Sequence, residues 1–360
     1  MKFVHIADIH FDSPFVNLSD KEYLGDLRRL DQRKVFKKVI EYIKENNIEL
    51  LFIAGDVYEH KYIKKTTIDY INNLFKEIPN TKIFITPGNH DPFIKNSYYN
   101  KYIWNNNVKI FNSNIEKIET EQADIYGFGF NDFYCTNFNL DNVNIESKNK
   151  LNILIMHGTI DGASIEEKQY NSFKSKTLKE KGFDYVALGH IHKLDYNTNE
   201  NQRIVYPGSL VSLGFDEPGP HGMIVGELNK EKINLEFIPL DEKEFIIDEL
   251  DITEINSKED LIEKLNELKY NDNKFIEIYL IGKRNFEIDT YELNKLINNN
   301  QIIKIKNKTK INYNLEKLSK ENTLKGIFIN KMLEKLNNTD NIEEKEIIEK
   351  AIEVGLDSLK

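Results

Sequence analysis

The sequence predicts an α/β (α+β) fold with one large domain and a smaller second domain. Short apolar runs of the length of buried strands recur along the first half of the chain. Between the first three runs, the stretches 31–46 and 66–78 carry the apolar periodicity of helices that pack on a core. The length of 360 residues exceeds what one hydrophobic core commonly serves. We therefore expect a sheet with helical crossovers, followed by a second domain.

Each of five apolar runs ends in side chains that can bind a metal ion. The runs cover residues 2–7, 50–54, 83–85, 151–156 and 185–188. The residues that follow them are Asp8-Ile9-His10, Gly55-Asp56, Asn89-His90-Asp91 after a Pro-Gly turn, His157-Gly158 and His190-Ile191-His192. Strand ends of this kind line the edge where open α/β sheets keep their chemistry. A structural role would explain any one of these histidines, but not five of the eight in the chain.

These residue types predict a two-metal hydrolytic centre, in which two cations about 3.5–4 Å apart hold the attacking and leaving oxygens. Carboxylates are scarce at the strand ends, which makes Asp56 the natural bridge between the ions. Asp8 and His10 lie on one face of a strand end, so both can reach one ion. His190 and His192 share that spacing, although they could serve neighbouring ions. A net charge of about +2 for two cations and two carboxylates favours a phosphoester over a peptide or a sugar.

In this order, the motifs resemble the signature of the calcineurin-like metallophosphoesterases, over residues 1 to about 195. The resemblance implies a β-sandwich flanked by helices. It also implies one ion on Asp8, His10, Asp56 and His192, and a second ion on Asp56, Asn89, His157 and His190. His90 is then left without a metal, and the resemblance implies that it stabilises or protonates the leaving oxygen. Two roles stay open for Asp91: it orients His90, or it caps the helix that follows.

The roles of His60 and of the aromatic residues near 100 each leave two alternatives open. In DNA-cutting members of the family, a histidine commonly stands three residues after the aspartate that matches Asp56. This chain has Glu59 there and His60 one position later, so a substrate-binding role for His60 is open. The aromatic cluster at 98–104 favours core packing, although such rings can also stack on unpaired bases.

Residues 195–240 change to short strands joined by turns. The segments 206–210 and 214–222, with 10–15 near the start, are similar to the SbcD and YhaO type of DNA repair nuclease. These nucleases are bacterial relatives of the meiotic recombination nuclease. The resemblance implies DNA as the substrate and an SMC-like ATPase, of the SbcC or YhaN type, as the partner. We expect residues 1–240 to form the catalytic domain.

The remainder of the chain predicts a second domain and two terminal helices. Strand-like runs at 245–250, 275–281 and 302–305 alternate with helical stripes at 261–268 and 293–297. Residues 241–312 would thus form a β-α-β-α-β unit, which in the SbcD branch is a capping domain that narrows the approach to the metals. Residues 313–360 carry two further helices. They dock the partner ATPase, as the resemblance implies, or they pack on the capping domain.

Charge argues against an independent DNA-binding surface. The chain has 49 Lys and Arg against 59 Asp and Glu, a net charge of −10. Lys304, Lys306, Lys308 and Lys310 would share one face if their strand continued. They could bind phosphates, but the protective lysines of an edge strand are slightly favoured.

The single cysteine, Cys135, excludes an intramolecular disulfide framework and fits a reducing cytosol. We expect it to be a packed or incidental thiol. No apolar run is long enough to cross a bilayer, so a membrane association is not expected.

The predicted function is metal-dependent cleavage of DNA, as the exonuclease or endonuclease subunit of a cytoplasmic DNA repair complex. Mn²⁺ is the expected ion, although zinc or iron would accept the same ligands. A homodimer is left open. One alternative is a small-molecule phosphatase or cyclic-nucleotide phosphodiesterase on the same centre, which the acidic surface favours. Another is a non-catalytic scaffold whose metals only hold a partner, which the complete ligand set argues against.

Overall fold

The computed structural model describes residues 1–18, 23–134, 143, 145, 149–160, 174–196 and 203–359. Cys135 lies outside them. The described chain forms two compact units, one of Met1–Ile247 with Tyr270–Glu277 and one of Asp248–Lys269 with Ile278–Lys360. The domain boundaries expected after residues 240 and 312 stay predictions. Among the described residues, no helix combines the length and the apolar character that a membrane span requires.

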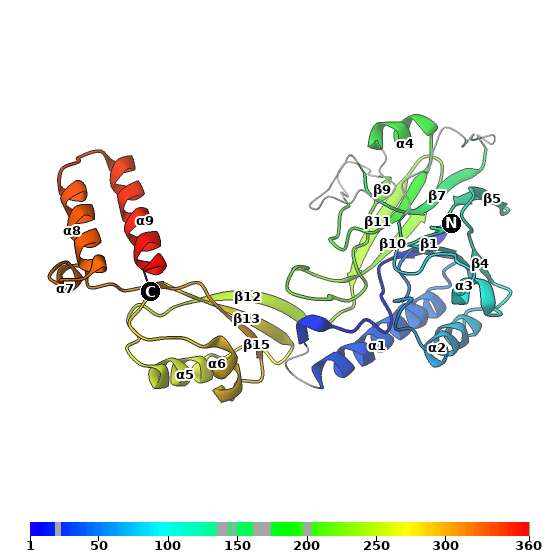
Figure 1. Cartoon of the computed structure of the whole chain (residues 1–360). Coiled ribbons are helices and arrows are strands. Elements are labelled where there is room, and N and C mark those ends of the chain that lie inside the picture. Colours follow the sequence, from blue (N-terminus) through cyan, green and yellow to red (C-terminus); the bar gives the residue numbers. More distant parts are fainter. Residues whose placement is uncertain are drawn as a thin grey trace. The chain divides into compact units, whose positions relative to one another are not determined.

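The first unit is built on two sheets (Figure 1). One has the strand order β11-β10-β1-β2-β3-β4 and the other β5-β6-β7-β8-β9. Strands β1 to β4 run parallel, and so do β6 to β9. The first sheet comprises β1 (Lys2–Ile6), β2 (Leu50–Ala54), β3 (Lys82–Thr86), β4 (Val108–Ile110), β10 (Gly222–Leu228) and β11 (Ile233–Pro239). The second comprises β5 (Glu116–Glu119), β6 (Ala123–Gly127), β7 (Leu151–His157), β8 (Tyr185–Gly189) and β9 (Ile204–Val205).

Alternate strand residues build two different cores. Phe3 and Phe52 of the first sheet share a buried cluster with Ile153 and Tyr185 of the second, so the two sheets pack face to face. The intervening residues, such as Val4, point to the other face. There they pack on α1 (Leu24–Glu45) and α2 (Lys65–Lys76). Leu178 of α4 (Ser175–Lys181) covers the outer face of the second sheet. The expected fold class, a sandwich flanked by helices, is confirmed.

Helix α1 begins earlier than the apolar periodicity predicts, because two of its first three inward positions are polar. Arg28 and Gln32 are fully buried. The Arg28 guanidinium pairs with Asp241 and donates to the Ser212 carbonyl oxygen. Gln32 donates to the backbone of the loop after β1. A polar inward face of this kind is invisible to a search for apolar stripes.

The aromatic cluster at 98–104 is core, as favoured. Tyr99, in the short helix α3 (Tyr98–Lys101), is buried, and Tyr98, Tyr102 and Trp104 pack against the same cluster. Ile103 differs from its neighbours because its side chain is 90% exposed. The 3₁₀ turn η1 (Val16–Leu18) follows the first ligand loop.

The second unit contains the remaining helices, seen in Figure 1 with α8 and α9 as a hairpin. A three-stranded sheet has the order β12-β13-β15, and the division between the two units falls within β12 and β13. A small sheet pairs β14 with β16. The strands are β12 (Glu244–Asp251), β13 (Lys274–Ile281), β14 (Lys283–Arg284), β15 (Ile302–Asn307) and β16 (Lys310–Ile311). The helices are α5 (Lys258–Glu267), α6 (Thr290–Leu296), α7 (Leu315–Ser319), α8 (Leu324–Asn337) and α9 (Ile342–Ser358).

The four alternating lysines do not share one strand: Lys304 and Lys306 lie in β15, an edge strand as favoured, whereas Lys308 and Lys310 follow it. Strand β15 ends at Asn307, whose side-chain oxygen accepts hydrogen bonds from Thr309 N and Oγ1 and turns the chain. Lys310 then pairs in β16 with Lys283 of β14. Lys306 and Lys308 instead both lie over the Tyr279 ring, with Nζ 5.2 and 3.5 Å from its centroid.

Candidate metal centre

The loops that follow β1 and β2 are bound tightly to one another. Asp8, His10 and Asp56 have φ values of 50°, 50° and 52°, which residues other than glycine rarely adopt. The amides of Ile9 and His10 both donate to the Asp56 carbonyl oxygen at 2.9 Å. From α1, Gln32 Nε2 donates to the carbonyl oxygens of Ile9 and His10, also at 2.9 Å. The side chains of both loops are thereby fixed on a rigid backbone.

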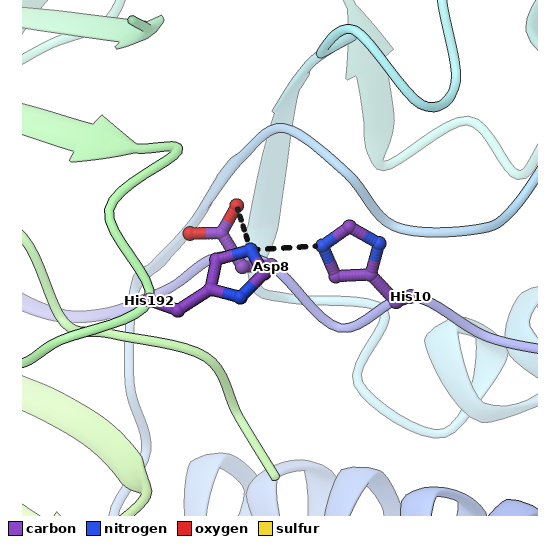
Figure 2. A group of neighbouring side chains, drawn as sticks. All are labelled: Asp8, His10 and His192. Atoms are coloured by element: carbon purple, nitrogen blue, oxygen red, sulfur yellow. Dashed lines mark hydrogen bonds and ion pairs between the residues drawn. The ribbon is translucent and has the colours of Figure 1, made fainter. Parts of the chain in front are cut away.

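Asp8, His10 and His192 form the first ligand cluster (Figure 2). Figure 2 shows the two imidazoles turned toward each other, with His10 Nε2 and His192 Nε2 3.2 Å apart. Asp8 Oδ1 lies 3.9 Å from His192 Nε2. Each Nδ1 is held from behind by a carboxylate, Glu59 at 2.8 Å from His10 and Glu217 at 2.5 Å from His192. Ligand histidines commonly have such a partner, which directs Nε2 at the metal.

The second cluster, formed by Asp8, Asp56 and His157, adjoins the first cluster and shares Asp8 with it. Asp56 Oδ2 lies 3.7 Å from His10 Nε2 and 3.3 Å from His157 Nε2. The same His157 nitrogen lies 3.0 Å from Asn89 Oδ1, while its Nδ1 faces the Ala54 carbonyl oxygen at 2.9 Å. A Cβ on Gly55 would lie 2.2 Å from His157 Nδ1, so only glycine lets β2 end this close to the ring. The nitrogen and oxygen donors of both clusters fit divalent cations.

His190 lies beside the second cluster. Its ring is edge-on to His157, with centroids 5.1 Å apart, and its amide donates to both Asp8 carboxylate oxygens at 3.0 Å. Burial and the charge of His157 lower the pKa of His190 to about 3, so its ring is neutral, as a metal ligand must be.

Interactions between the other imidazoles and carboxylates of the centre favour the charged form of both kinds of group. Although burial opposes it, the Asp56 carboxylate raises the pKa of His157 to about 9. In the same way, Glu217 raises the pKa of His192 to about 10 against the effect of burial. Burial would raise the pKa of Asp56, but His157 and His10 hold it well below the usual range. Cations that bind to these residues must displace the protons from the imidazoles.

His90 stands at the edge of the centre, on the loop after β3. Its side chain is 44% exposed, and its ring lies edge-on to His10 with centroids 4.8 Å apart. Its amide donates to Asp56 Oδ1 at 2.9 Å, and its Nδ1 lies 3.0 Å from Glu59 Oε2. Burial would lower the pKa of His90, but the hydrogen bond with Glu59 and the charge of Asp56 raise it to about 9.

Asp91 ties together the loops after β2 and β3. It is fully buried and accepts hydrogen bonds from the amides of Asp56, Val57 and Gly88, at 3.2, 2.6 and 2.7 Å. It also accepts one from the Tyr99 hydroxyl at 2.5 Å. Burial raises the pKa of Asp91 to about 6. In the described chain these bonds reach neither the His90 ring nor a helix start, so the arrangement differs from both roles considered for Asp91.

His60 is near the centre but outside both clusters. Its amide donates to the His90 carbonyl oxygen at 3.0 Å, and its ring lies edge-on to Phe133 with centroids 5.6 Å apart. Burial and the charge of Lys101 lower its pKa.

Three residues that hold site residues in place were not predicted from the sequence. Glu59, Glu217 and Gln32 contact site residues that are 49, 25 and 22 positions away in sequence, and none belongs to a strand-end motif. The rule that a ligand histidine binds a carboxylate or carbonyl through its second nitrogen would have directed a search to the acidic loop residues. It would not have chosen among them.

Comparisons with known proteins show the family of this chain. A family model described as calcineurin-like phosphoesterase matches residues 1–194. The uncharacterized metallophosphoesterase YhaO of Bacillus subtilis is 24% identical over 247 residues, which cover 66% of this chain and 60% of YhaO. The match thus spans less than two thirds of the length of YhaO.

Two further relatives are named as the SbcD component of the nuclease SbcCD. That of Staphylococcus saprophyticus is 28% identical over 305 residues, 76% of each chain. That of Staphylococcus epidermidis is 28% identical over 318 residues, 76% of this chain and 78% of the relative. The solved structure of TT1561 of Thermus thermophilus aligns with a TM-score of 0.38 and 10% identity, over 66% of this chain and 98% of that one. Because the family model matches more than half of the 360 residues, this chain belongs to the calcineurin-like phosphoesterases, a superfamily of metal-dependent hydrolases.

Proposed function

We propose that the chain is a metal-dependent phosphodiesterase that cleaves DNA, as the nuclease subunit of a DNA repair complex. The observation that carries the hydrolytic part is the position of Asp56. One carboxylate oxygen of this residue lies 3.3 Å from His157 Nε2 and 3.7 Å from His10 Nε2, where the two ligand clusters adjoin. A shared carboxylate between two nitrogen-rich clusters suits a pair of cations and an in-line displacement at phosphorus.

The ligands are proposed from the family resemblance, and the groups Asp8, His10 and His192 and Asp8, Asp56 and His157 support them. One ion is held by Asp8, His10, Asp56 and His192, and the other by Asp56, Asn89, His157 and His190. When bound, the two ions would supply Lewis-acid stabilisation of the charge on the phosphoryl oxygens. Mn²⁺ is the proposed ion, because the donors are imidazole nitrogens and carboxylate or amide oxygens without sulfur.

His90 is proposed to give a proton to the leaving oxygen. Glu59 holds its Nδ1, which leaves Nε2 for the substrate, and the side chain is 44% exposed. Its pKa of about 9 keeps the ring protonated at neutral pH. A positioned general acid typically contributes a factor of about 10²–10⁴ in rate. His60 lies on the loop after β2, its amide donates to the His90 carbonyl oxygen, and it is proposed to bind the substrate.

DNA and an SMC-like ATPase are the proposed partners. The two SbcD relatives, named as part of a nuclease, are similar over 76% of this chain. The helical hairpin of the second unit exposes apolar side chains on both helices, namely Leu324, Ile327, Ile342, Ile347 and Val354. Exposed apolar groups on one hairpin favour a docked protein partner. Since the chain has a net charge of −10, that partner would supply much of the attraction for DNA.

The experiment is Mn²⁺-dependent cleavage of end-labelled linear DNA beside bis(p-nitrophenyl) phosphate, for the native chain and His90→Ala, with metal content measured for both. We expect the variant to keep its metals and to lose about 10²-fold or more in rate on DNA. Rapid cleavage of the small ester with DNA left intact, even with the ATPase added, would instead assign a small-molecule phosphodiesterase. A metal-loaded native chain that cleaves neither substrate would point to a scaffold.

A further inference from the structure

Phe133, on the loop that follows β6, leaves part of its ring exposed. Its side chain is 39% exposed, whereas the other phenylalanines in the described part of the chain are buried or half-buried. Single exposed apolar side chains are common on protein surfaces. The position of this ring, and not its exposure alone, therefore has to indicate what it does.

The loop after β6 borders the metal centre. The Phe130 amide donates to the Pro87 carbonyl oxygen at 3.0 Å, and the Phe130 carbonyl oxygen accepts from the Phe93 amide at 2.6 Å. A Cβ on Gly129 would lie 2.4 Å from Pro87 Cδ, so this loop lies directly against the loop after β3. The Phe130 ring is edge-on to that of His157, with centroids 5.6 Å apart. The backbone that carries Phe133 is thus fixed beside a proposed ligand.

Phe133 lies on the side of the centre where the leaving oxygen is proposed to depart. Its ring contacts the His60 ring, with centroids 5.6 Å apart and an interplanar angle of 67°. The His60 amide in turn donates to the carbonyl oxygen of His90, the proposed proton donor. The nucleotide that carries the leaving oxygen must extend from the metal ions past His90. Its base, or that of the next nucleotide, can then reach the exposed ring.

We propose that Phe133 stacks on an unpaired nucleobase on the leaving-group side of the scissile phosphate. The inference rests on the proposed function and specifies its substrate as an unpaired strand. Every base offers a flat π-face, so an aromatic ring binds a strand without regard to sequence. Stacking also does not require positive charge, which a chain with a net charge of −10 lacks overall. The aromatic cluster at 98–104 does not provide this contact, because its rings pack in the core.

The test compares two variants of Phe133 in the full chain. Phe133→Leu keeps an apolar side chain but removes the flat ring, and Phe133→Tyr keeps the ring. The control is Tyr291→Ala, which removes a ring that is 68% exposed on α6. Binding is measured by fluorescence anisotropy with two single-stranded oligonucleotides of equal length, in the presence of a chelator that prevents cleavage. One oligonucleotide carries its bases, and the other has an abasic residue at every position.

The native chain should bind the strand with bases more tightly than the abasic strand, which has the same number of phosphates. Loss of one stacked base lowers affinity by about 5- to 150-fold. Phe133→Leu should lose a factor of that size for the strand with bases and bind the abasic strand like the native chain. Phe133→Tyr and Tyr291→Ala should keep the native preference. With Mn²⁺, Phe133→Leu should raise KM for the strand with bases and leave kcat unchanged, because neither the proposed ligands nor His90 are altered.

Equal affinity of the native chain for the two strands would overturn the stacking contact while leaving the proposed function intact. Native affinities in Phe133→Leu would also overturn it. So would an equal loss for both strands in that variant, because the ring would then only shape its loop. A native chain that prefers the strand with bases but cleaves no DNA with Mn²⁺ would overturn the proposed function, and the stacking contact would stand.

Discussion

His5 is a buried histidine outside both ligand clusters. It lies in β1 between the Tyr185 hydroxyl, 2.9 Å from Nδ1, and the Leu188 carbonyl oxygen, 3.1 Å from Nε2. Burial lowers its pKa from the ordinary 6.5 to about 3. In the window between these two values the unfolded chain binds a proton at this residue and the folded chain does not. Acidification through that window therefore favours unfolding.

We expect the free energy of unfolding to fall by about 1.4 kcal/mol per pH unit below pH 6.5 from His5 alone. The measurement is chemical denaturation of the native chain and of His5→Gln at several values between pH 4 and pH 7. The free energy of unfolding of the variant should depend less steeply on pH, because its unfolding takes up about one proton fewer. Equal slopes in the two chains would mean that His5 does not stay neutral in the fold.

Asp56 is the single carboxylate that the proposed centre shares between its ions. Mn²⁺ at about 100 times its dissociation constant should raise the free energy of unfolding by about 2.7 kcal/mol. In Asp56→Asn this gain should largely disappear, because both sites lose a charged ligand. The measurement is denaturation with Mn²⁺ and with a chelator. Asp184→Asn, which removes a carboxylate bound to Lys230 outside both ligand clusters, should lose baseline stability but keep the Mn²⁺ effect. A full Mn²⁺ effect in Asp56→Asn would exclude it as the bridge.

The ends of β2 and β8 approach each other more closely than side chains allow. A Cβ on Gly189 would lie 1.9 Å from the Ala54 carbonyl oxygen and 2.9 Å from the Ala7 side chain. The same carbonyl oxygen faces His157 Nδ1, so a shift of the backbone would disturb a proposed ligand.

Gly189→Ala should therefore cost about 3 kcal/mol of stability or more, through overpacking of the two sheets. It should weaken Mn²⁺ binding as well, because His157 loses its position. Gly25→Ala is the control, since its Cβ would meet nothing nearer than 3.6 Å at the start of α1. We expect that variant to lie within about 1 kcal/mol of the native chain. Denaturation and calorimetry check both variants, and a stable, metal-binding Gly189→Ala would contradict the close approach.

The elements were predictable wherever their inward face is apolar. Strands β1, β2, β3, β7 and β8 stand close to where the apolar runs placed them. The start of α1 was not predictable, because Arg28 and Gln32 occupy its inward face and form hydrogen bonds with residues far away in sequence. Short strands such as β9 and β14 have two residues each, too few for any periodicity to show.

The residues of the site were predictable where they follow an apolar strand. Their hydrogen-bond partners were not predictable. Strand ends placed the ligand types at one edge, and the first cluster of Asp8, His10 and His192 forms there. The partners of these ligands lie on loops, where neither period nor motif restricts the choice. Glu59 and Glu217 could therefore be found only from the folded chain.

Across the molecule, the net charge of −10 and the helical hairpin together favour a protein partner. Ile347 and Ile342 on α9 have side chains that are 68% and 75% exposed. Replacing one of them by a charged residue changes little inside the hairpin, whose own core contains Ile348, Ile352 and Leu356.

Ile347→Glu should therefore abolish co-purification with the proposed ATPase partner and leave hydrolysis of the small diester at the native rate. Lys350→Glu is the control, because it places a glutamate on a polar position of the same helix and lowers the net charge by two, against one for Ile347→Glu. It should keep the partner. Equal loss of the partner in both variants would show that charge, and not the apolar surface, decides binding. Unchanged binding of the partner by Ile347→Glu would exclude the hairpin as the docking surface.

The positive φ angles at the strand ends also bear on how this family changes over time. Asp8, His10, Asp56 and His190 are among seven described residues other than glycine with such angles. Each costs on the order of 1 kcal/mol, and glycine would remove that cost. Selection for hydrolysis would have to oppose the replacement of these residues by glycine. In lineages that have lost the activity, we expect glycine to replace the ligands first, while the apolar core stays unchanged.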